Sequence, residues 1–455
     1  MDVTTSRQMK IAYIGGGSKA WAWKLMSDLA TDPDIAGEVL LYDIDFEAAQ
    51  RNEKIGNGIE AQNFRYKAVQ SLKDALTGAD FVVISILPGT LQDMMSDVHT
   101  PEEYGIYQSV GDSTGPGGIL RAMRTIPMYV EIAQAIEKYA PRAWVINYTN
   151  PMSMCTDTLY RVFPKIKAFG CCHEVFGTQK LMVSMLDEMC GYKNVSRQEI
   201  RVNVKGINHF TWIDAASYKG MDLFPLYLEF AKKHRDGIDN HDFGEDDSCR
   251  MYSFKQQVKF DLFLRYGLVA AAGDRHLAEF CPGSWYLKDP ETVKSWGFGI
   301  TPVSERIKEY HKRLEKSDAL IQGTRKFQMD VSGEEGVAQM KAIMGLSELV
   351  TNVNMPNRGQ IANIPLGRVV ETNAHFSSDK VVPVIAGDLP GVPHAMTMRV
   401  SDNYDVVVTS CLKGEFEGCL RAFQNDPLVT ISPDKAEELF FKMVNNTKKY
   451  LGQYK

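Results

Sequence analysis

The chain has 455 residues, of which 44% are hydrophobic and 24% charged, and its formal net charge is −6. This composition predicts a globular protein of two domains, and because there is neither a basic cluster nor a long apolar run, it argues against nucleic acid or a membrane as a partner. The eight cysteines form no disulfide framework, and with a polar N-terminus that carries no signal segment they predict a cytoplasmic protein with reduced thiols.

The first part of the chain alternates short β-branched runs with longer amphipathic stretches. This rhythm predicts parallel strands joined by helices, which is a Rossmann-like, doubly wound sheet. The predicted strands are residues 11–14, 39–42, 81–86, 144–148 and 166–169. Helices are predicted at residues 20–30, after a glycine turn, and at 119–139, where Pro141 ends the pattern.

Beyond about residue 200 the pattern of the sequence changes. It predicts a strand at 200–213, helices at 224–233 and 252–272, and a strand-rich stretch at 361–384. The stretches 393–424 and 433–450 are predicted to be helical, with Ser432-Pro433 as the N-cap and first residue of the last helix. We therefore expect an α/β protein, with a Rossmann-like nucleotide domain at residues 1–197 and an α+β domain for substrate and oligomer contacts at residues 198–455.

A glycine turn, Gly15-Gly16-Gly17-Ser18, ends the first predicted strand and opens the first predicted helix. A backbone without side chains can approach a pyrophosphate, and amides at a helix N-terminus can donate to it. The spacing is not a strict G-x-G-x-x-G, and glycine turns also occur for steric reasons alone. Asp43, at the end of the second strand, could accept from both ribose hydroxyls and would repel a 2′-phosphate, so the pair predicts NAD rather than NADP. A solvated helix cap is the alternative for Asp43.

Two polar segments lie between the glycine turn and the middle of the chain. The first, Gly111-Asp112-Ser113-Thr114-Gly115-Pro116-Gly117-Gly118, precedes a long helix and presents one carboxylate, Asp112. The second, Asn147-Tyr148-Thr149-Asn150-Pro151, ends a predicted strand, where Asn147 could contact the cofactor and Asn150 could bind sugar hydroxyls. Considered singly, each segment is better explained by turn chemistry, since Asp and Asn stabilise their own loops.

Cys172 and His209 are candidate metal ligands, in Gly170-Cys171-Cys172-His173 and Asn208-His209. Cys172 is predicted at the carboxyl end of a parallel strand, where ligands bind in such sheets, and His209 at the first strand of the second domain. A thiolate and an imidazole that leave other positions open suit a catalytic metal. Alternation along the strand places Cys171 and Cys172 on opposite faces, so only one of the two can face the cleft, and the residues alone leave the choice open. No CxxC or HExxH motif is present, so the alternatives are a core position for the cysteine and a hydrogen-bonded surface or core position for the histidine.

The motifs together resemble those of the NAD- and manganese-dependent glycoside hydrolases of family 4. In chain order they are the glycine turn, Gly115-Pro116-Gly117-Gly118, Asn150-Pro151, Gly170-x-Cys172-His173, Asn208-His209, Asn363-Ile364-Pro365 and Val369-Val370-Glu371. The resemblance implies a fold like that of lactate and malate dehydrogenases. It also implies NAD and Mn²⁺, or another divalent metal, as cofactors, with Cys172 and His209 as the metal ligands.

Within this family the chain looks most like the α-galacturonidase and α-glucuronidase branch, through residues 111–118 and 169–179. The phospho-glycosidases carry an arginine-bearing loop where this chain has Leu87-Pro88-Gly89-Thr90-Leu91-Gln92, which contains no basic residue. The resemblance therefore implies a uronide as substrate. A uronide needs a cation for its carboxylate, and Arg275 is the candidate. Pairing of Arg275 with Glu279 one helical turn away is the alternative.

The chemistry of the family differs from hydrolysis by two carboxylates. It implies that the sugar first gives a hydride from C3 to NAD⁺ and then loses its C2 proton to a base, while the metal stabilises the enediolate. The glycosidic oxygen then leaves with help from an acid, water adds to the intermediate, and the hydride returns to the sugar. Asp112 matches the leaving-group acid of the family. The base is Asp274 or Tyr266, and Asp274 is favoured because a tyrosine must lower its pKa of about 10.

The predicted function is NAD-dependent hydrolysis of α-glycosides of a uronic acid, with galacturonides before glucuronides. The α-galactosidase, α-glucosidase and 6-phospho-glycosidase activities of the same family are alternatives, as is a malate/lactate-type 2-hydroxyacid dehydrogenase, which would consume NAD and not need Cys172. A regulatory NAD-binding protein without turnover is a further hypothesis, which the chemical groups of Asp112, Asn150, Cys172 and His209 disfavour. A homodimer or homotetramer is expected.

Overall fold

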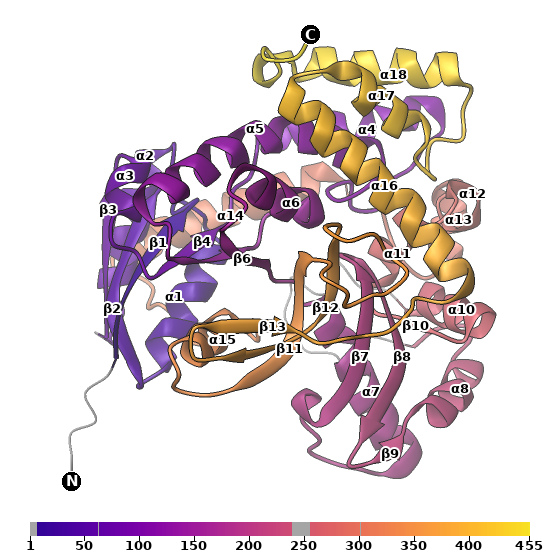
Figure 1. Cartoon of the computed structure of the whole chain (residues 1–455), viewed down its shortest axis with the longest axis horizontal. Helices are drawn as coiled ribbons and strands as arrows, with labels where there is room; N and C mark the ends of the chain where they lie inside the picture. The colour runs from indigo at the N-terminus through magenta and orange to yellow at the C-terminus, as the bar shows by residue number, and fades with distance from the viewer. Residues whose placement is uncertain (1–6, 62, 239–254, 301) are drawn as a thin grey trace.

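A computed structural model of the chain describes residues 7–61, 63–238, 255–300 and 302–455. Two β-sheets lie next to each other, with helices packed around them (Figure 1). The sheets meet at strands β12 and β7, where the Asn373 Nδ2 donates to the Val202 carbonyl at 2.7 Å. No helix within the described ranges is long and apolar enough to span a bilayer.

The large sheet contains nine strands of the described residues, in the order β13-β12-β11-β6-β5-β4-β1-β2-β3. Strands β1 to β6 run parallel, and their order is that of a doubly wound Rossmann sheet. Their bounds are Arg7–Ile14 (β1), Ile35–Tyr42 (β2), Phe64–Val69 (β3), Phe81–Ile84 (β4), Trp144–Asn147 (β5) and Lys167–Gly170 (β6). The predicted fold class is thus confirmed.

Five of the six parallel strands are those that the sequence predicts, because central strands are buried on both faces and read as continuous apolar runs. All four residues of β4 are buried, as are those of β5. Strand β3 is missing from the prediction. It lies at the edge of the sheet, where Phe64 and Tyr66 are buried while Arg65 and Lys67 are exposed, so it alternates instead of forming an apolar run.

Helices cover both faces of the parallel sheet, as expected for crossover connections. One face packs against α1 (Trp21–Thr31), α2 (Phe46–Asn57) and α15 (Gly336–Ile343), and the other against α3 (Leu72–Leu76), α5 (Gly115–Tyr139) and α6 (Met152–Val162). Figure 1 shows α5 and α6 above the sheet and α1 and α15 below it. Helix α5 begins four residues before its predicted start, at Gly115, whose amide donates to Asp426 Oδ2 at 3.0 Å.

Three antiparallel strands from the second half of the chain extend the large sheet. They are β11 (Leu349–Pro356), β12 (Val369–Ser377) and β13 (Lys380–Pro383), and β11 lies beside β6 with Asn354 opposite Gly170. The strand-rich prediction for 361–384 holds for β12 and β13. Strand β11 was not predicted, because its asparagines interrupt the apolar pattern, although Asn352 and Asn354 are buried.

The small sheet corrects one prediction. Its strands are β7 (Ile200–Ile207), β8 (Phe210–Tyr218), β9 (Met221–Asp222) and β10 (Val269–Ala270). The single strand expected at 200–213 is wrong, since β7 and β8 form an antiparallel hairpin in which Ile207 pairs with Phe210. The chain reverses at Asn208-His209, where His209 has a φ of 63°. This two-residue turn is flanked by apolar residues on both sides, so the sequence looks like one continuous strand.

Three helices pack on the small sheet: α7 (Glu174–Cys190), α8 (Phe224–Lys233) and α10 (Gln257–Tyr266). Helix α8 has the bounds that the sequence predicts. The helix expected at 252–272 is shorter, because α10 ends at Tyr266, Gly267 follows it with a φ of 70°, and Val269 already belongs to β10. Residues 252–254 of that prediction lie outside the described residues.

The remaining helices are α4 (Leu91–His99), η1 (Pro101–Tyr104), η2 (Arg197–Glu199), α11 (Asp274–Phe280), α12 (Gly283–Tyr286), α13 (Pro290–Ser295), α14 (Val303–Ile321), α16 (Gly391–Lys413), α17 (Phe416–Gln424), α18 (Pro433–Asn446) and η4 (Lys448–Tyr450). Of these, α4, α16, α17 and α18 pack on α5, and α14 packs on α2 and α4. The predicted helical tail is confirmed as α16, α17 and α18. The predicted cap is confirmed too, since Ser432 Oγ accepts from the Lys435 amide at 3.4 Å.

Candidate active site

The glycine turn lies where β1 meets its two neighbours, β2 and β4, which is the point at which the strand order reverses. The amides of Gly15 and Gly16 both donate to the Tyr42 carbonyl at 2.9 Å. Gly15 has a φ of 91°, and a Cβ there would lie 2.0 Å from the Ser85 carbonyl oxygen. Only glycine fits this position, so the turn is built to pack tightly between the neighbouring strands.

Asp43 and Ser18 hold the turn in place. Asp43 Oδ2 accepts from the Gly17 amide at 2.8 Å, and its Oδ1 accepts from the Asp45 amide at 3.0 Å. Burial raises the pKa of Asp43, while the two backbone hydrogen bonds lower it. Ser18 Oγ accepts from the Trp21 amide at 3.1 Å, at the start of α1. The carboxylate predicted for the ribose therefore lies directly beside the predicted pyrophosphate turn.

The two predicted asparagines differ in their surroundings. Asn147 is fully buried, and its Oδ1 accepts from the Tyr129 hydroxyl at 2.5 Å and from the Thr149 amide at 2.9 Å. Its side chain thus stabilises the segment after β5. The Asn150 carbonyl accepts from Arg121 Nε at 3.0 Å, and the buried Asn150 Oδ1 has no hydrogen-bond partner in the described part of the chain.

Asp112 lies in the loop before α5, and the second half of the chain anchors this loop. Ser113 Oγ donates to Asp112 Oδ1 at 2.9 Å, and the Tyr404 hydroxyl of α16 donates to the Ser113 carbonyl at 3.0 Å. Asp426 Oδ2 accepts from the Thr114 hydroxyl at 3.3 Å and from the Gly115 amide. Asp112 is consequently held on a fixed backbone.

His209 is oriented by the same loop. Its Nδ1 lies 2.8 Å from Ser113 Oγ, whose proton is directed to Asp112 Oδ1. The Ser113 oxygen therefore accepts from the Nδ1–H of His209, which leaves the lone pair of the neutral ring on Nε2. A left-handed backbone at a buried histidine is uncommon, and such conformations collect at functional sites.

His276 comes from α11, and its ring lies against that of His209, with the ring centroids 3.8 Å apart. Its Nε2 is 3.8 Å from Oε1 of Glu174, the first residue of α7 after β6. The buried Nδ1 of His276 has no hydrogen-bond partner among the residues described. Sequence reasoning missed this histidine, although it stands in the Gly273-Asp274-Arg275-His276 segment that supplied two other candidates.

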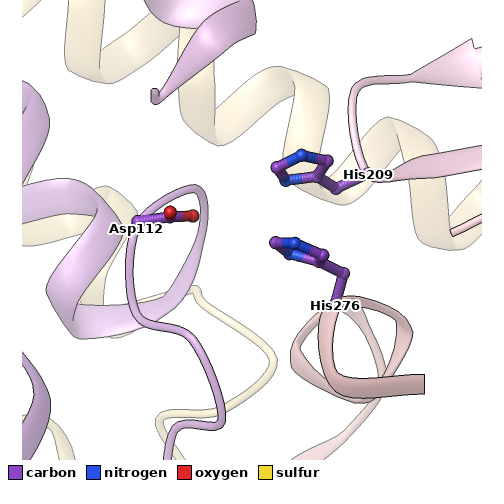
Figure 2. A group of neighbouring side chains, drawn as sticks. All are labelled: Asp112, His209 and His276. Carbon is purple, nitrogen blue, oxygen red and sulfur yellow. The ribbon is translucent and has the colours of Figure 1, made fainter. Parts of the chain in front are cut away.

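Asp112, His209 and His276 form one group, with one ligand atom of each within 4.8 Å of those of the other two. Figure 2 shows the carboxylate and the two rings pointing toward one another from three separate segments of the chain. One carboxylate and two imidazoles suit Mn²⁺ or Zn²⁺ as ligands. The group therefore fits a divalent metal, and three protein ligands leave further coordination positions for substrate or water.

The protonation states of the group also suit a metal. Burial alone would raise the pKa of Asp112, but the neighbouring His276 and Arg121 lower it to about 2. Burial and the charge of His276 lower the pKa of His209 to about 3, and burial lowers the pKa of His276. At neutral pH the group thus consists of an ionised carboxylate and two neutral imidazoles, which are the forms that bind metals.

The structure places Cys172 next to this group but not within it. Cys172 is buried, and burial, together with the charges of Glu371 and Glu174, raises the pKa of its thiol well above the ordinary value. Cys171 packs on the other face, as alternation predicts, and its Sγ donates to Gln339 Oε1 at 2.9 Å. The assignment of Cys172 as a ligand stays a prediction.

Glu371, in the late strand motif, links both predicted ligand segments from β12. Its Oε1 accepts from Asn352 Nδ2 at 2.6 Å, and the same Nδ2 donates to the Cys172 carbonyl at 3.1 Å. Its Oε2 accepts from Asn208 Nδ2 at 3.4 Å. Burial raises the pKa of Glu371 to about 7. Asn352, one of the asparagines that interrupt the apolar pattern of β11, therefore connects Glu371 with the Cys172 segment.

The other predicted side chains of this region do not join the metal group. Asp274 is fully buried, its Oδ1 accepts from the Lys259 amide at 3.1 Å, and burial raises its pKa to about 6. Tyr266 packs edge-on against Trp212 with ring centroids 6.3 Å apart, and burial raises its pKa. Arg275 donates from Nη2 to the Ser109 carbonyl. The roles of these three residues stay predictions.

Known proteins resemble this chain over nearly its full length. The model for the family 4 glycosyl hydrolases matches residues 10–188, and the model for their C-terminal domain matches residues 204–429. An alpha-galacturonidase from Thermoanaerobacterium saccharolyticum is 56% identical over 98% of this chain and 97% of its own length.

Solved structures also resemble this chain over nearly its full length. The crystal structure of lplD from Bacillus subtilis, described as a candidate glucosidase, has a TM-score of 0.92 and 52% identity and covers 96% of this chain and 99% of its own. A 6-phospho-alpha-glucosidase from gut microorganisms, in complex with NAD and Mn²⁺, shares the fold with a TM-score of 0.82 and 19% identity, covering 99% of this chain and all of its own.

The fold, the site and these matches define the class of this protein, a glycoside hydrolase built on a Rossmann-type sheet. More specifically, the chain belongs to family 4 of the glycosyl hydrolases, which confirms the resemblance that its motifs carry.

Proposed function

We propose that this protein hydrolyses α-galacturonides with NAD⁺ and a divalent metal such as Mn²⁺. The observation that carries the chemistry is the Asp112–His209–His276 group, which lies against Glu174 at the start of α7, after β6 of a sheet with a dinucleotide-type turn. The sugar follows from the alpha-galacturonidase that is 56% identical to this chain.

The residues fit both cofactors. The glycine turn with Asp43 would bind NAD⁺, and Asp112, His209 and His276 would hold the metal. Bound there, NAD⁺ supplies hydride transfer and the metal draws electron density from the oxygens of the sugar. Ser113 keeps the proton of His209 on Nδ1, so this ring is oriented before a metal arrives, and Glu174 Oε1 lies 3.8 Å from Nε2 of His276.

We assign Asp112 to the metal and not to the leaving group. A carboxyl group with a pKa of about 2 carries no proton at neutral pH, so it cannot serve as an acid there. Of the two candidate bases for the C2 proton, Asp274 is preferred. Its pKa of about 6 leaves it ionised at neutral pH, whereas burial moves the pKa of Tyr266 further from neutrality.

Cleavage of nitrophenyl glycosides tests the function directly. The α-galacturonide, α-glucuronide, α-galactoside and 6-phospho-α-glucoside are compared after dialysis, with and without added NAD⁺ and Mn²⁺. The galacturonide should be cleaved fastest, only with both cofactors, and without net formation of NADH, because the hydride returns to the sugar. Equal rates without the cofactors would contradict the mechanism, and preference for the galactoside or the phosphorylated sugar would contradict the uronide. The predicted homo-oligomer and cytoplasmic location stay predictions.

The protons released on metal binding should distinguish the two possible sets of ligands. If Asp112, His209 and His276 hold Mn²⁺, no ligand has a proton to lose near neutral pH, because burial keeps the imidazoles neutral and Asp112 is ionised, so the unchanged protein and Cys172→Ser should release equal numbers of protons. A Cys172 ligand must first lose a proton from a thiol of raised pKa, so about one proton would leave for each ion and the affinity would rise with pH.

Titration calorimetry in buffers of different ionisation enthalpy counts these protons, with Cys172→Ser as the comparison. If the unchanged protein releases about one proton more than Cys172→Ser does, Cys172 is a ligand of the metal.

A further inference from the structure

Four hydrogen bonds join the loop before Asp112 to helix α11, which carries His276. Glu279 Oε1 accepts from the amides of Val110 and Gly111, at 2.7 and 2.9 Å. Ser109 Oγ donates to the Arg275 carbonyl at 2.5 Å, and Arg275 Nη2 donates back to the Ser109 carbonyl. The loop and the helix are therefore fixed to each other at consecutive residues.

Glu279 is an unusual residue for this place. It is fully buried, and burial and the charge of Asp112 raise its pKa to about 8. Its Oε2 has no hydrogen-bond partner within the described ranges. Burying a carboxyl group whose polar atoms are only partly satisfied costs stability, so the side chain is unlike a residue that only fills the core.

The rest of the loop is held by other elements. After Asp112, the loop is bonded to Tyr404 and Asp426 of the C-terminal helical region, neither of which lies on α11. Before Asp112, the loop is bonded to α11 through Ser109 and Glu279. Only the second set of bonds connects Asp112 with the helix of His276.

We propose that Glu279 is a positioning residue, which binds the backbone of residues 110 and 111 to α11 and so holds Asp112 within metal-binding distance of His276. The inference rests on the proposed function, since it takes Asp112 and His276 as ligands of the metal. Glu279 acts as a hydrogen-bond acceptor for two amides, and its effect on the metal passes through Asp112.

Three variants separate this role from simple packing. Glu279→Ala removes the acceptor, whereas Glu279→Gln keeps an Oε1 that accepts from both amides. Asp28→Ala is the matched control, because the buried Asp28 also binds a loop through two hydrogen bonds, from the Ser332 amide at 2.7 Å and the Ser332 hydroxyl at 2.5 Å. If Glu279→Ala does not fold, Glu279→Asp, whose shorter side chain withdraws the acceptor, takes its place.

Each variant is measured for Mn²⁺ affinity by electron paramagnetic resonance, NAD⁺ affinity by calorimetry, and hydrogen exchange of the peptide that contains residues 109–112. Glu279→Ala should weaken Mn²⁺ binding at least about tenfold, in the range for lost support around a metal ligand, and should speed exchange of the peptide. NAD⁺ affinity should change less than about twofold, and Glu279→Gln and Asp28→Ala should bind Mn²⁺ within about threefold of the unchanged protein.

Several results would overturn the proposal. These are normal Mn²⁺ affinity in Glu279→Ala, an equal loss in Asp28→Ala, or a loss in Glu279→Gln as large as in Glu279→Ala. Absence of Mn²⁺ binding by the unchanged protein would instead contradict the proposed function. Hydrogen exchange still decides in that case, because an unchanged exchange rate in Glu279→Ala would refute the positioning role and a faster rate would support it.

Discussion

Replacing His276 with alanine should weaken Mn²⁺ binding by at least about a hundredfold, which exceeds the usual cost of losing a supporting hydrogen bond around a metal. The change removes one of the three side chains whose ligand atoms lie within 4.8 Å of one another. Hydrolysis should fall by about a thousandfold or more, because a metal supplies several kcal/mol of charge stabilisation in the transition state. NAD⁺ should bind normally, since the glycine turn and Asp43 are untouched.

Three other variants, measured in the same way, serve as comparisons for His276→Ala. His209→Ala should match His276→Ala, and His311→Ala, at an exposed position of α14, should behave as the unchanged protein. Cys172→Ser should keep most of its Mn²⁺ affinity if the metal lies at the group of Figure 2. Strong loss in Cys172→Ser combined with normal binding in His276→Ala would refute the assignment of His276 and favour the pair implied by the motifs.

Replacing Asp43 with alanine should raise the Kd for NAD⁺ by at least about thirtyfold. Hydrogen bonds to a charged acceptor contribute about 1.5–3 kcal/mol each, and Asp43 would accept from two ribose hydroxyls. The variant also frees the Gly17 and Asp45 amides, which the carboxylate binds at 2.8 and 3.0 Å, so the turn loses its anchor. Fluorescence titration with NAD⁺ measures the loss, and Mn²⁺ affinity reports whether the rest of the site is intact.

Asp45→Ala is the matched control for this experiment. Asp45 is also acidic and lies two residues away, but its carboxylate caps α2 by accepting from the Ala48 amide at 3.1 Å. Its loss should cost about 1 kcal/mol of stability and leave NAD⁺ affinity within about twofold. If Asp45→Ala lowers NAD⁺ affinity as much as Asp43→Ala does, the effect belongs to the packing of α2 and not to the ribose.

The nucleotide half of this site could be predicted because its signals are local. Strands buried on both faces appear as apolar runs, and the glycine turn and Asp43 each follow such a run directly. Their meeting in space then follows from the fixed order of a doubly wound sheet. Strand β3 could have been found by its alternation of buried and charged residues.

The metal half could not be derived in this way, because its three members belong to a loop, a hairpin turn and a short helix far apart in the sequence. No spacing rule connects Asp112 with His276. Their distance depends on the bonds between Glu279 and the loop, which only the tertiary structure reveals. The family motifs predicted Cys172 as a metal ligand, and Cys172 is a buried neighbour of the metal group. His276 is part of none of these motifs.

The extension of the parallel sheet by β11 has a consequence for the synthesis of the protein. Asn352 of β11 binds the carbonyl of Cys172, which precedes it by 180 positions. On the ribosome, the six parallel strands are thus made long before the strand that covers their edge at β6. Open strand edges invite pairing with other chains. During that interval the edge of β6 is unpaired, so the nascent chain is then most open to pairing with other chains and has the greatest need of chaperones.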